Sequence, residues 1–137
     1  MKPFLFFLLL SLLSPFAQAQ NVPYNVVFDL TSKDTLDHQA VIRWLSGISS
    51  ARPDAKLEVV LYGGSLDMVQ KEKSTVAAPL LQLLQNKNVS VKVCAVAMKH
   101  HNIEASQLLP GVGVVPDGIY EIIQREKDGW GYIKATH

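Results

Sequence analysis

Short apolar runs, separated by longer segments with helical spacing, constrain the fold of this chain most. Segment 89–93 alternates valines with Ser90 and Lys92, while 24–30 and 56–62 are mostly continuous apolar runs, typical of strands covered on both faces. Strands that alternate with helices favour a parallel sheet, because parallel neighbours need long crossover connections. We therefore expect a three-layer α/β/α fold with a mainly parallel sheet of about five strands.

The expected elements follow one another without a repeat or a linker. Strands are predicted at 24–30, 56–62, 89–94 and 112–115, and 130–134 is expected to be a terminal strand or an extended tail. Helices are predicted at 35–49, 74–85 and 118–127, with short helical turns at 66–69 and 95–98. Pro79 lies inside the second helical pattern and should kink it or delay its start. In the last helix, Ile119, Ile122 and Ile123 are the expected buried stripe.

The N-terminal segment 1–19 has the features of a secretory signal peptide. Lys2 provides a positive charge, 4–13 is an apolar run, and Ala17-Gln18-Ala19 has the small-x-small form of a cleavage site. We expect cleavage after this site, which leaves 20–137 as a single domain located in a bacterial periplasm or secreted. A retained membrane anchor is the alternative. No later apolar run is long enough to span a bilayer, so no membrane contact is expected after cleavage.

Charge and cysteine content narrow the range of partners. Thirteen Lys and Arg residues balance twelve Asp and Glu residues, so the composition does not favour binding to nucleic acid or to an anionic membrane. The single cysteine, Cys94, cannot form an intramolecular disulfide. In an oxidising compartment it is buried and inert, paired with another chain, or kept reactive for a purpose.

Cys94 is predicted at the junction between a strand and a helix. The valine alternation ends at this residue, and 95–98 favours helix. Ligands bind beyond the carboxyl ends of strands in open α/β sheets, and a helix N-terminus favours a thiolate. The alternative is that Cys94 is simply a small buried hydrophobic residue.

Other candidate site residues lie at the same predicted edge of the sheet. Asp29 ends the first strand and could orient a ligand or cap the next helix. Gly63 and Gly64 follow the second strand, where they could admit a ligand or form a structural turn. His100 and His101 are adjacent and so cannot chelate as an i,i+4 pair would. We expect no metal site and no cofactor.

Several segments together resemble the DsrE/DsrF-like sulfur relay family. The resemblance covers 24–134. Within the family, the chain is most similar to a small stand-alone, exported branch. The segments that carry it are 91–99 with Ile103, 108–112, 115–122 and 129–134.

The resemblance implies an α/β fold, a homo-oligomer, and a cysteine that carries sulfur as a persulfide. By this match Cys94 is the sulfur-carrying residue. Relatives often have a His-Gly pair where this chain has Tyr62-Gly63. The candidate site then consists of the catalytic Cys94 and a pocket formed by Asp29, Tyr62, Gly63, Gly64, Met98 and His100.

The functional hypothesis is an exported sulfur relay protein. Cys94 would take sulfane sulfur from a donor, either a protein or a small sulfur species, and pass it to an acceptor. One cysteine is sufficient for a carrier, whereas a dithiol oxidoreductase needs a second one to resolve its mixed disulfide. Two alternatives remain: a non-catalytic periplasmic binding or assembly module with a structural cysteine, and a regulator in which Cys94 pairs between subunits.

Overall fold

The structure, a computed structural model, describes residues 22–136. Its strands are β1 (Asn25–Leu30), β2 (Lys56–Leu61), β3 (Val89–Cys94), β4 (Gly113–Val115) and β5 (Gly131–Lys134). The α-helices are α1 (Thr35–Ala51), α2 (Ala77–Leu83), α3 (Ala95–His100) and α4 (Gly118–Lys127), and two 3₁₀ helices are η1 (Gly63–Val69) and η2 (Ala105–Gln107). The expected signal peptide at 1–19 lies outside the described residues. Within 22–136, no helix is both long and apolar enough to cross a membrane.

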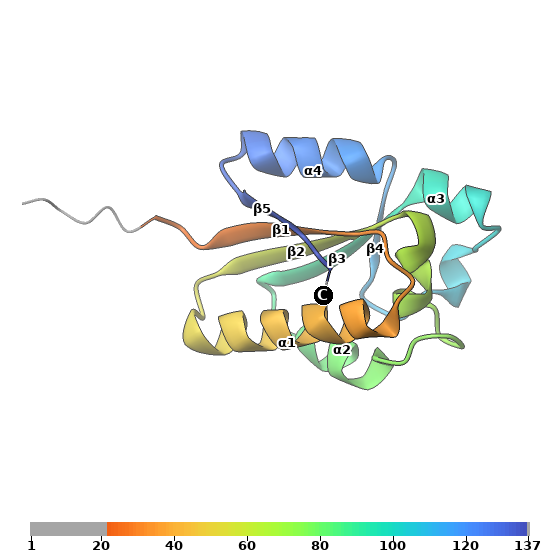
Figure 1. Cartoon of the computed structure of the whole chain (residues 1–137), viewed down its shortest axis with the longest axis horizontal. Coiled ribbons are helices and arrows are strands. Elements are labelled where there is room, and N and C mark those ends of the chain that lie inside the picture. Colours follow the sequence, from red (N-terminus) through yellow and green to blue (C-terminus); the bar gives the residue numbers. More distant parts are fainter. Residues whose placement is uncertain (1–21, 137) are drawn as a thin grey trace, which may run out of the picture.

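The five strands form one parallel sheet in the order β4-β3-β2-β1-β5. This confirms the expected α/β class and the strand number. Helices α1 and α2 cover one face, whereas α4 lies on the other (Figure 1). The segment with α4 carries the chain from β4 at one edge to β5 at the opposite edge, which places the topological switch point between β1 and β5.

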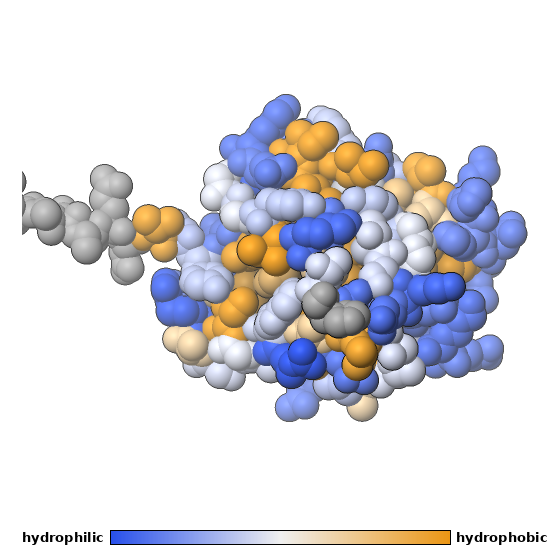
Figure 2. All heavy atoms as spheres, viewed as in Figure 1, coloured by the Kyte–Doolittle hydropathy of each residue, from blue (hydrophilic) through white to orange (hydrophobic). Residues whose placement is uncertain are grey.

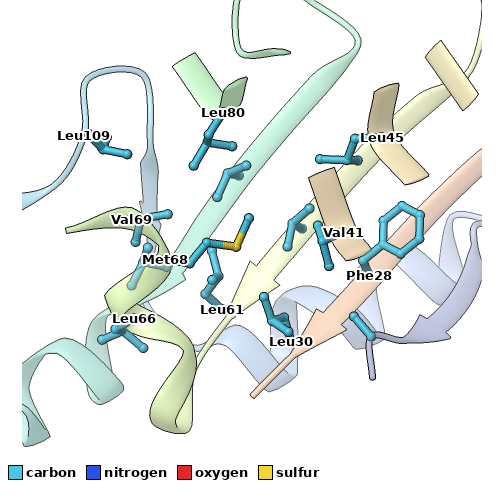
Figure 3. Packing of buried hydrophobic residues seen from close by; sticks show 14 of the residues in the cluster. Phe28, Leu30, Val41, Leu45, Leu61, Leu66, Met68, Val69, Leu80 and Leu109 are labelled. Atoms are coloured by element: carbon cyan, nitrogen blue, oxygen red, sulfur yellow. The ribbon is translucent and has the colours of Figure 1, made fainter. Parts of the chain in front are cut away.

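The face towards α1 and α2 holds most of the apolar core. Alternate residues of the central strands, such as Phe28, Leu30 and Leu61, pack against Val41 and Leu45 of α1 (Figure 3). These side chains are at most 3% exposed. Because burial of one such side chain stabilises a fold by about 1.5–3 kcal/mol, this layer dominates the stability of the molecule.

The opposite surface of the sheet, which we call the α4 face, is much more polar. Its buried apolar cluster contains only three residues, Val27, Val60 and Ile122. Strand residues alternate between the two faces of a sheet. The alternation and the strand register therefore identify the polar residues of the central strands that lie on the α4 face. They are Asp29 of β1, Glu58 of β2, and Ser90 and Lys92 of β3.

Helix α2 is shorter than the predicted segment 74–85. Helix α2 begins at Ala77 rather than at 74, and it ends at Leu83. Pro79 is its third residue, in the first turn, where a missing backbone N–H leaves no hydrogen bond unmade. The proline therefore delays the start of the helix and does not kink its interior.

The expected apolar stripe of α4 was wrong in part. Ile122 is buried, but Ile119 is 56% exposed and Ile123 is 42% exposed. The small apolar cluster of the α4 face accommodates only one line of helix side chains, so the other isoleucines face outward. Figure 2 shows hydrophobic residues at the surface over α4.

Candidate functional site

Cys94 is the last residue of β3 and the N-cap of α3, as the sequence indicates. Its backbone is extended, with φ −71° and ψ 120°, and Ala95 begins the helix directly after it. The side chain is 5% exposed. The sulfur therefore lies at the carboxyl edge of the sheet, almost enclosed by its neighbours.

The strand register places Tyr62 next to Cys94 on the α4 face. Leu61 pairs with Val93, so the residues that follow them, Tyr62 and Cys94, are neighbours across the sheet. Tyr62 keeps an extended backbone, with φ −154° and ψ −178°, and so continues the alternation of β2. Val60, two residues earlier, pairs with both Lys92 and Asp29.

The first residue of α4 packs directly on this site. A Cβ atom on Gly118 would lie 3.0 Å from Cβ of Cys94, 3.2 Å from Cγ1 of Val60 and 3.6 Å from Cδ1 of Tyr62. The helix is capped by Asp117, whose Oδ1 accepts hydrogen bonds from the backbone N–H groups of residues 119 and 120 at 2.9 and 3.3 Å. Cys94 thus lies beside the starts of both α3 and α4.

Asp29 forms the centre of a polar cluster at the switch point. The residue is buried, at 4% exposed. Oδ2 accepts hydrogen bonds from the Tyr132 hydroxyl at 2.6 Å and from Nζ of Lys134 at 3.2 Å. Lys134 also donates to Oγ1 of Thr31 at 3.0 Å. Oδ1 of Asp29 is buried and has no hydrogen-bond partner.

The carboxylate of Asp29 helps to raise the pKa of two tyrosines, Tyr62 and Tyr132. Burial, followed by the interaction with Asp29, raises the pKa of Tyr62 to about 12. The hydrogen bond to Asp29 is the main reason that the pKa of Tyr132 is also raised to about 12. Nζ of Lys134 lies 5.9 Å from the centre of the Tyr62 ring. Both phenols therefore keep their protons at neutral pH.

The remaining predicted pocket residues have surroundings that differ from those of Asp29 and Tyr62. Gly63 and Gly64 begin η1 and line a separate pocket of about 250 Å³, together with His101. Met98 is 7% exposed and belongs to the main hydrophobic cluster, which also includes Cys94. His100 is exposed and its ring contacts His101 edge-on, with centroids 5.3 Å apart. Of the predicted pocket residues, Asp29 and Tyr62 therefore share the α4 face with Cys94.

Sequence reasoning did not include Lys92, Gly118, Tyr132 and Lys134 in the site. Tyr132 and Lys134 are two residues apart in a strand, a spacing that places them on one face, but nothing local indicates that this strand pairs with β1. Within residues 22–136, no group of three His, Cys, Asp or Glu side chains is arranged to hold a metal ion.

The chain is similar to a known protein family and to several solved structures. A family model described as the DsrE/DsrF-like family matches residues 25–135. A structure of a protein of unknown function from Methanobacterium thermoautotrophicum is similar, with 24% identity, a TM-score of 0.76, and coverage of 81% of this chain and 98% of that one. No curated protein matches the chain.

Two further solved structures have the same fold. A conserved protein of unknown function from Bacteroides thetaiotaomicron is 18% identical, with a TM-score of 0.66 over 81% of this chain and 94% of that one. The ychN protein from E. coli is 15% identical, with a TM-score of 0.66 over 82% of this chain and 98% of that one. These likenesses are evidence of a shared fold alone.

Proposed function

The chain belongs to the DsrE/DsrF-like family, and from that premise we propose that it is an exported sulfur relay protein that carries sulfane sulfur on Cys94. Family membership indicates sulfur relay in general terms. The observation that carries the specific proposal is the position of Cys94 at the carboxyl edge of the sheet, beside the starts of α3 and α4. This is the edge at which open α/β sheets bind their ligands.

The proposed transfer consists of two displacement steps at sulfur. The Cys94 thiolate attacks the sulfane sulfur of a donor, the donor's own S–S bond breaks, and the donor leaves with the electron pair. Cys94 then holds the sulfur as a persulfide. A thiolate of the acceptor attacks the outer sulfur, and Cys94 leaves as a thiolate. Atoms and electrons balance without a redox cofactor or a second cysteine.

The surroundings of Cys94 suit such a carrier. Backbone N–H groups at the starts of α3 and α4 provide partial positive charge near an anionic sulfur. The enclosure of the side chain, which is 5% exposed, would protect a persulfide from further oxidation. Lys92 lies two residues earlier on the same strand and face, where it adds a cation to this surface.

Export and self-association form part of the proposal. The charged, apolar and small-residue pattern of 1–19 supports secretion to a periplasm or beyond. Exposed apolar side chains on α4, at Ile119, Tyr120 and Ile123, support a homo-oligomer. Donor and acceptor are sulfur compounds or thiol proteins, and no nucleic acid or membrane is involved after cleavage.

Intact mass spectrometry tests the carrier function. The mature protein is incubated with polysulfide or thiosulfate, and the mass of the folded chain is measured before and after reduction. We expect a gain of one or more sulfur atoms that reduction removes and that Cys94→Ser abolishes. Absence of sulfur uptake, together with alkylation only after denaturation, would refute the proposal.

A second candidate is a non-catalytic binding or assembly module. Two observations favour it: the burial of Cys94, and the separate pocket of about 250 Å³ beside Gly63 and Gly64. Lys33, Lys73 and His101 line that pocket together with Asp67, which forms an ion pair with Lys73 at 3.2 Å, so a small anion would be held mainly by Lys33 and His101. Calorimetric binding of sulfate to Cys94→Ser would support this function, because that variant cannot carry sulfur.

A further inference from the structure

A groove of about 500 Å³ lies between α1 and the edge of the sheet formed by β1 and β5. Its floor is a row of alternate residues, Tyr24, Val26 and Phe28, which share one face of the sheet. Ile133 of β5 pairs with Phe28 and continues this floor to the edge, where it is 44% exposed. The groove therefore lies on the face opposite α4, and β2 separates its floor from the strand that carries Cys94.

Helix α1 forms the wall of the groove with two rows of residues. Trp44 and Ile48, one turn apart, form the inner row and pack against the hydrophobic core. The ring of Trp44 stacks on Phe28, with centroids 6.0 Å apart. Arg43 and Gly47, also one turn apart, form the outer row and are exposed. The wall is therefore apolar next to the sheet and open at its outer row.

Gly47 widens the groove at a position where glycine is not required. A Cβ atom on Gly47 would meet nothing within 4 Å beyond its own stretch of α1, so packing does not exclude a side chain. Its φ is not among the positive values of the chain, so the backbone does not require glycine either. Glycine inside a helix lowers stability relative to alanine. The missing side chain thus weakens α1 and leaves space that a ligand can fill.

Arg43 is a cation at the rim of this groove without an anionic partner. None of the ion pairs among residues 22–136 includes it, whereas Arg52, just after the same helix, is paired with Asp54 at 2.9 Å. A guanidinium presents a planar fork of N–H donors that matches the two oxygens of a carboxylate. A ligand with a carboxylate head and an apolar body would therefore complement both parts of the groove.

We infer that this groove is a binding site for a carboxylate with an unbranched alkyl chain. The row from Tyr24 to Phe28 is about 13 Å long, and such a narrow floor fits an extended chain better than a bulky ring system. The volume is within the range of about 300–1,000 Å³ that is usual for small-molecule sites. The chain lies along the floor and past Gly47, and the carboxylate pairs with Arg43. The site is separate from Cys94 and does not depend on sulfur transfer.

Calorimetric titration of the mature protein with decanoate, below the concentration at which decanoate forms micelles, tests the inference. We expect one saturable site per chain and a change in the fluorescence of Trp44, which lines the groove. Cys94→Ser should bind decanoate as the wild type does. A wild type that takes up sulfur but shows no saturable binding of decanoate overturns the inference and leaves the carrier function intact.

The role of Arg43 is tested by changing the head group of the ligand. We expect the wild type to bind decanoate about fivefold more tightly than decanol, because only the carboxylate forms an ion pair. Arg43→Gln should bind the two compounds equally, and Arg43→Lys should retain part of the preference. A wild type that does not distinguish decanoate from decanol overturns the inference.

The role of the open outer row is tested by filling it. Gly47→Leu places a side chain in the groove and should weaken the binding of decanoate on the order of tenfold or more. Ser46→Leu is the matched control: it adds the same side chain to the neighbouring position of α1, which lines a separate hollow beside α2, and should leave binding unchanged. Equal effects of the two variants would indicate non-specific adsorption and would overturn the inference.

Size-exclusion chromatography of the same variants distinguishes a ligand from a second copy of the chain. We expect Gly47→Leu to have the oligomeric state of the wild type. A change of state in this variant but not in Ser46→Leu would show that the groove is an interface between copies, which overturns the inference. If Gly47→Leu does not fold, the comparison of decanoate with decanol in Arg43→Gln decides.

Discussion

At the scale of single residues, a missing side chain sets how closely α4 approaches Cys94. We expect Gly118→Ala to lower the free energy of unfolding by about 1–3 kcal/mol, because its Cβ would lie 3.0 Å from Cys94 and 3.2 Å from Val60. Urea denaturation measures the change. Gly47→Ala is the control: it lies in α1 with nothing within 4 Å of the added atom, and should stabilise by about 0.5–1 kcal/mol. Equal effects of the two variants would contradict this account.

The tyrosines give a second prediction at the residue scale. The chain has four tyrosines, and the pKa values of Tyr62 and Tyr132 are raised to about 12. In a pH titration followed by ultraviolet absorbance, two of the tyrosines should ionise at higher pH than the other two. Tyr132→Phe and Tyr62→Phe should each remove one of these high-pH ionisations. Because an unfolded tyrosine ionises near pH 10, their contribution to stability is complete below pH 10 and is lost between about pH 10 and 12. A single ionisation step near pH 10 for all four would refute the polar cluster.

The sequence was sufficient to locate Cys94 and to include Asp29 and Tyr62, but it did not indicate Gly118 or the residues of β5. Valine alternation and the helix-forming run after it identify a strand end, which is local information. The contact between Asp29 and Tyr132 depends on the pairing of two strands from opposite ends of the chain. Local sequence patterns do not indicate which distant strands will pair. For the same reason they do not indicate that Gly118 lies close to Cys94.

At the scale of secondary-structure elements, α4 is held on the sheet by a buried ion-pair network. Nε of Arg125 donates to Oε1 of Glu58 at 3.0 Å, and its Nη2 donates to Glu121 at 2.8 Å. Ser90 donates to the other oxygen of Glu58 at 3.0 Å, and the Arg125 guanidinium lies 5.0 Å from the centre of the Trp130 ring. Burial raises the pKa of Glu58, although Arg125 acts against this shift. The carboxylate therefore depends on Arg125 to remain charged.

We expect Arg125→Ala to destabilise the protein by about 2–3 kcal/mol at pH 7, since it leaves Glu58 buried without its cation. The destabilisation caused by Arg125→Ala should be smaller at acidic pH. A carboxyl with a raised folded-state pKa contributes stability below its unfolded pKa and loses it as pH rises through the folded value. Urea denaturation at pH 4.5 and pH 7 measures this difference. Arg52→Ala breaks an exposed ion pair with Asp54 and should have no measurable effect at either pH.

The elements themselves were largely predictable, and two of the departures have clear physical causes. The start of α2 follows from Pro79, whose effect was foreseen as a choice between a kink and a delay. The outward position of Ile119 and Ile123 was not foreseen, because helical spacing indicates which residues share a side and not how much apolar sheet lies beneath them.

At the scale of the whole molecule, the alternation of strands and helices predicted the α/β class and the parallel sheet. The strand order was not predicted. Each of the first three crossovers moves to the adjacent position, but the last one returns past three strands to pair β5 with β1. Only this return creates the switch point and places Lys134 beside Asp29.

The proposed export leads to a prediction about the N-terminal segment 1–19. We expect the protein expressed in a bacterium to be recovered outside the cytoplasm with an N-terminus at Gln20, as measured by intact mass. Ala19→Arg should block cleavage, because signal peptidase requires a small residue at this site. Recovery of the wild-type chain with Met1 retained, in the cytoplasm, would refute the export proposal.

The pairing of β5 with β1 has a consequence for the order of events during synthesis. Asp29 and Lys134 are 105 residues apart in the sequence, so β1 gains its second neighbour only after residues 131–134 have emerged. Contacts so distant in sequence form late, since closing a long loop costs entropy before the contact can stabilise it. A nascent chain therefore stays open at this edge until β5 has been synthesised. For the export that we propose, an unfinished chain of this kind can still pass through a narrow secretion channel, and the candidate site around Cys94 is complete only after β5 has docked.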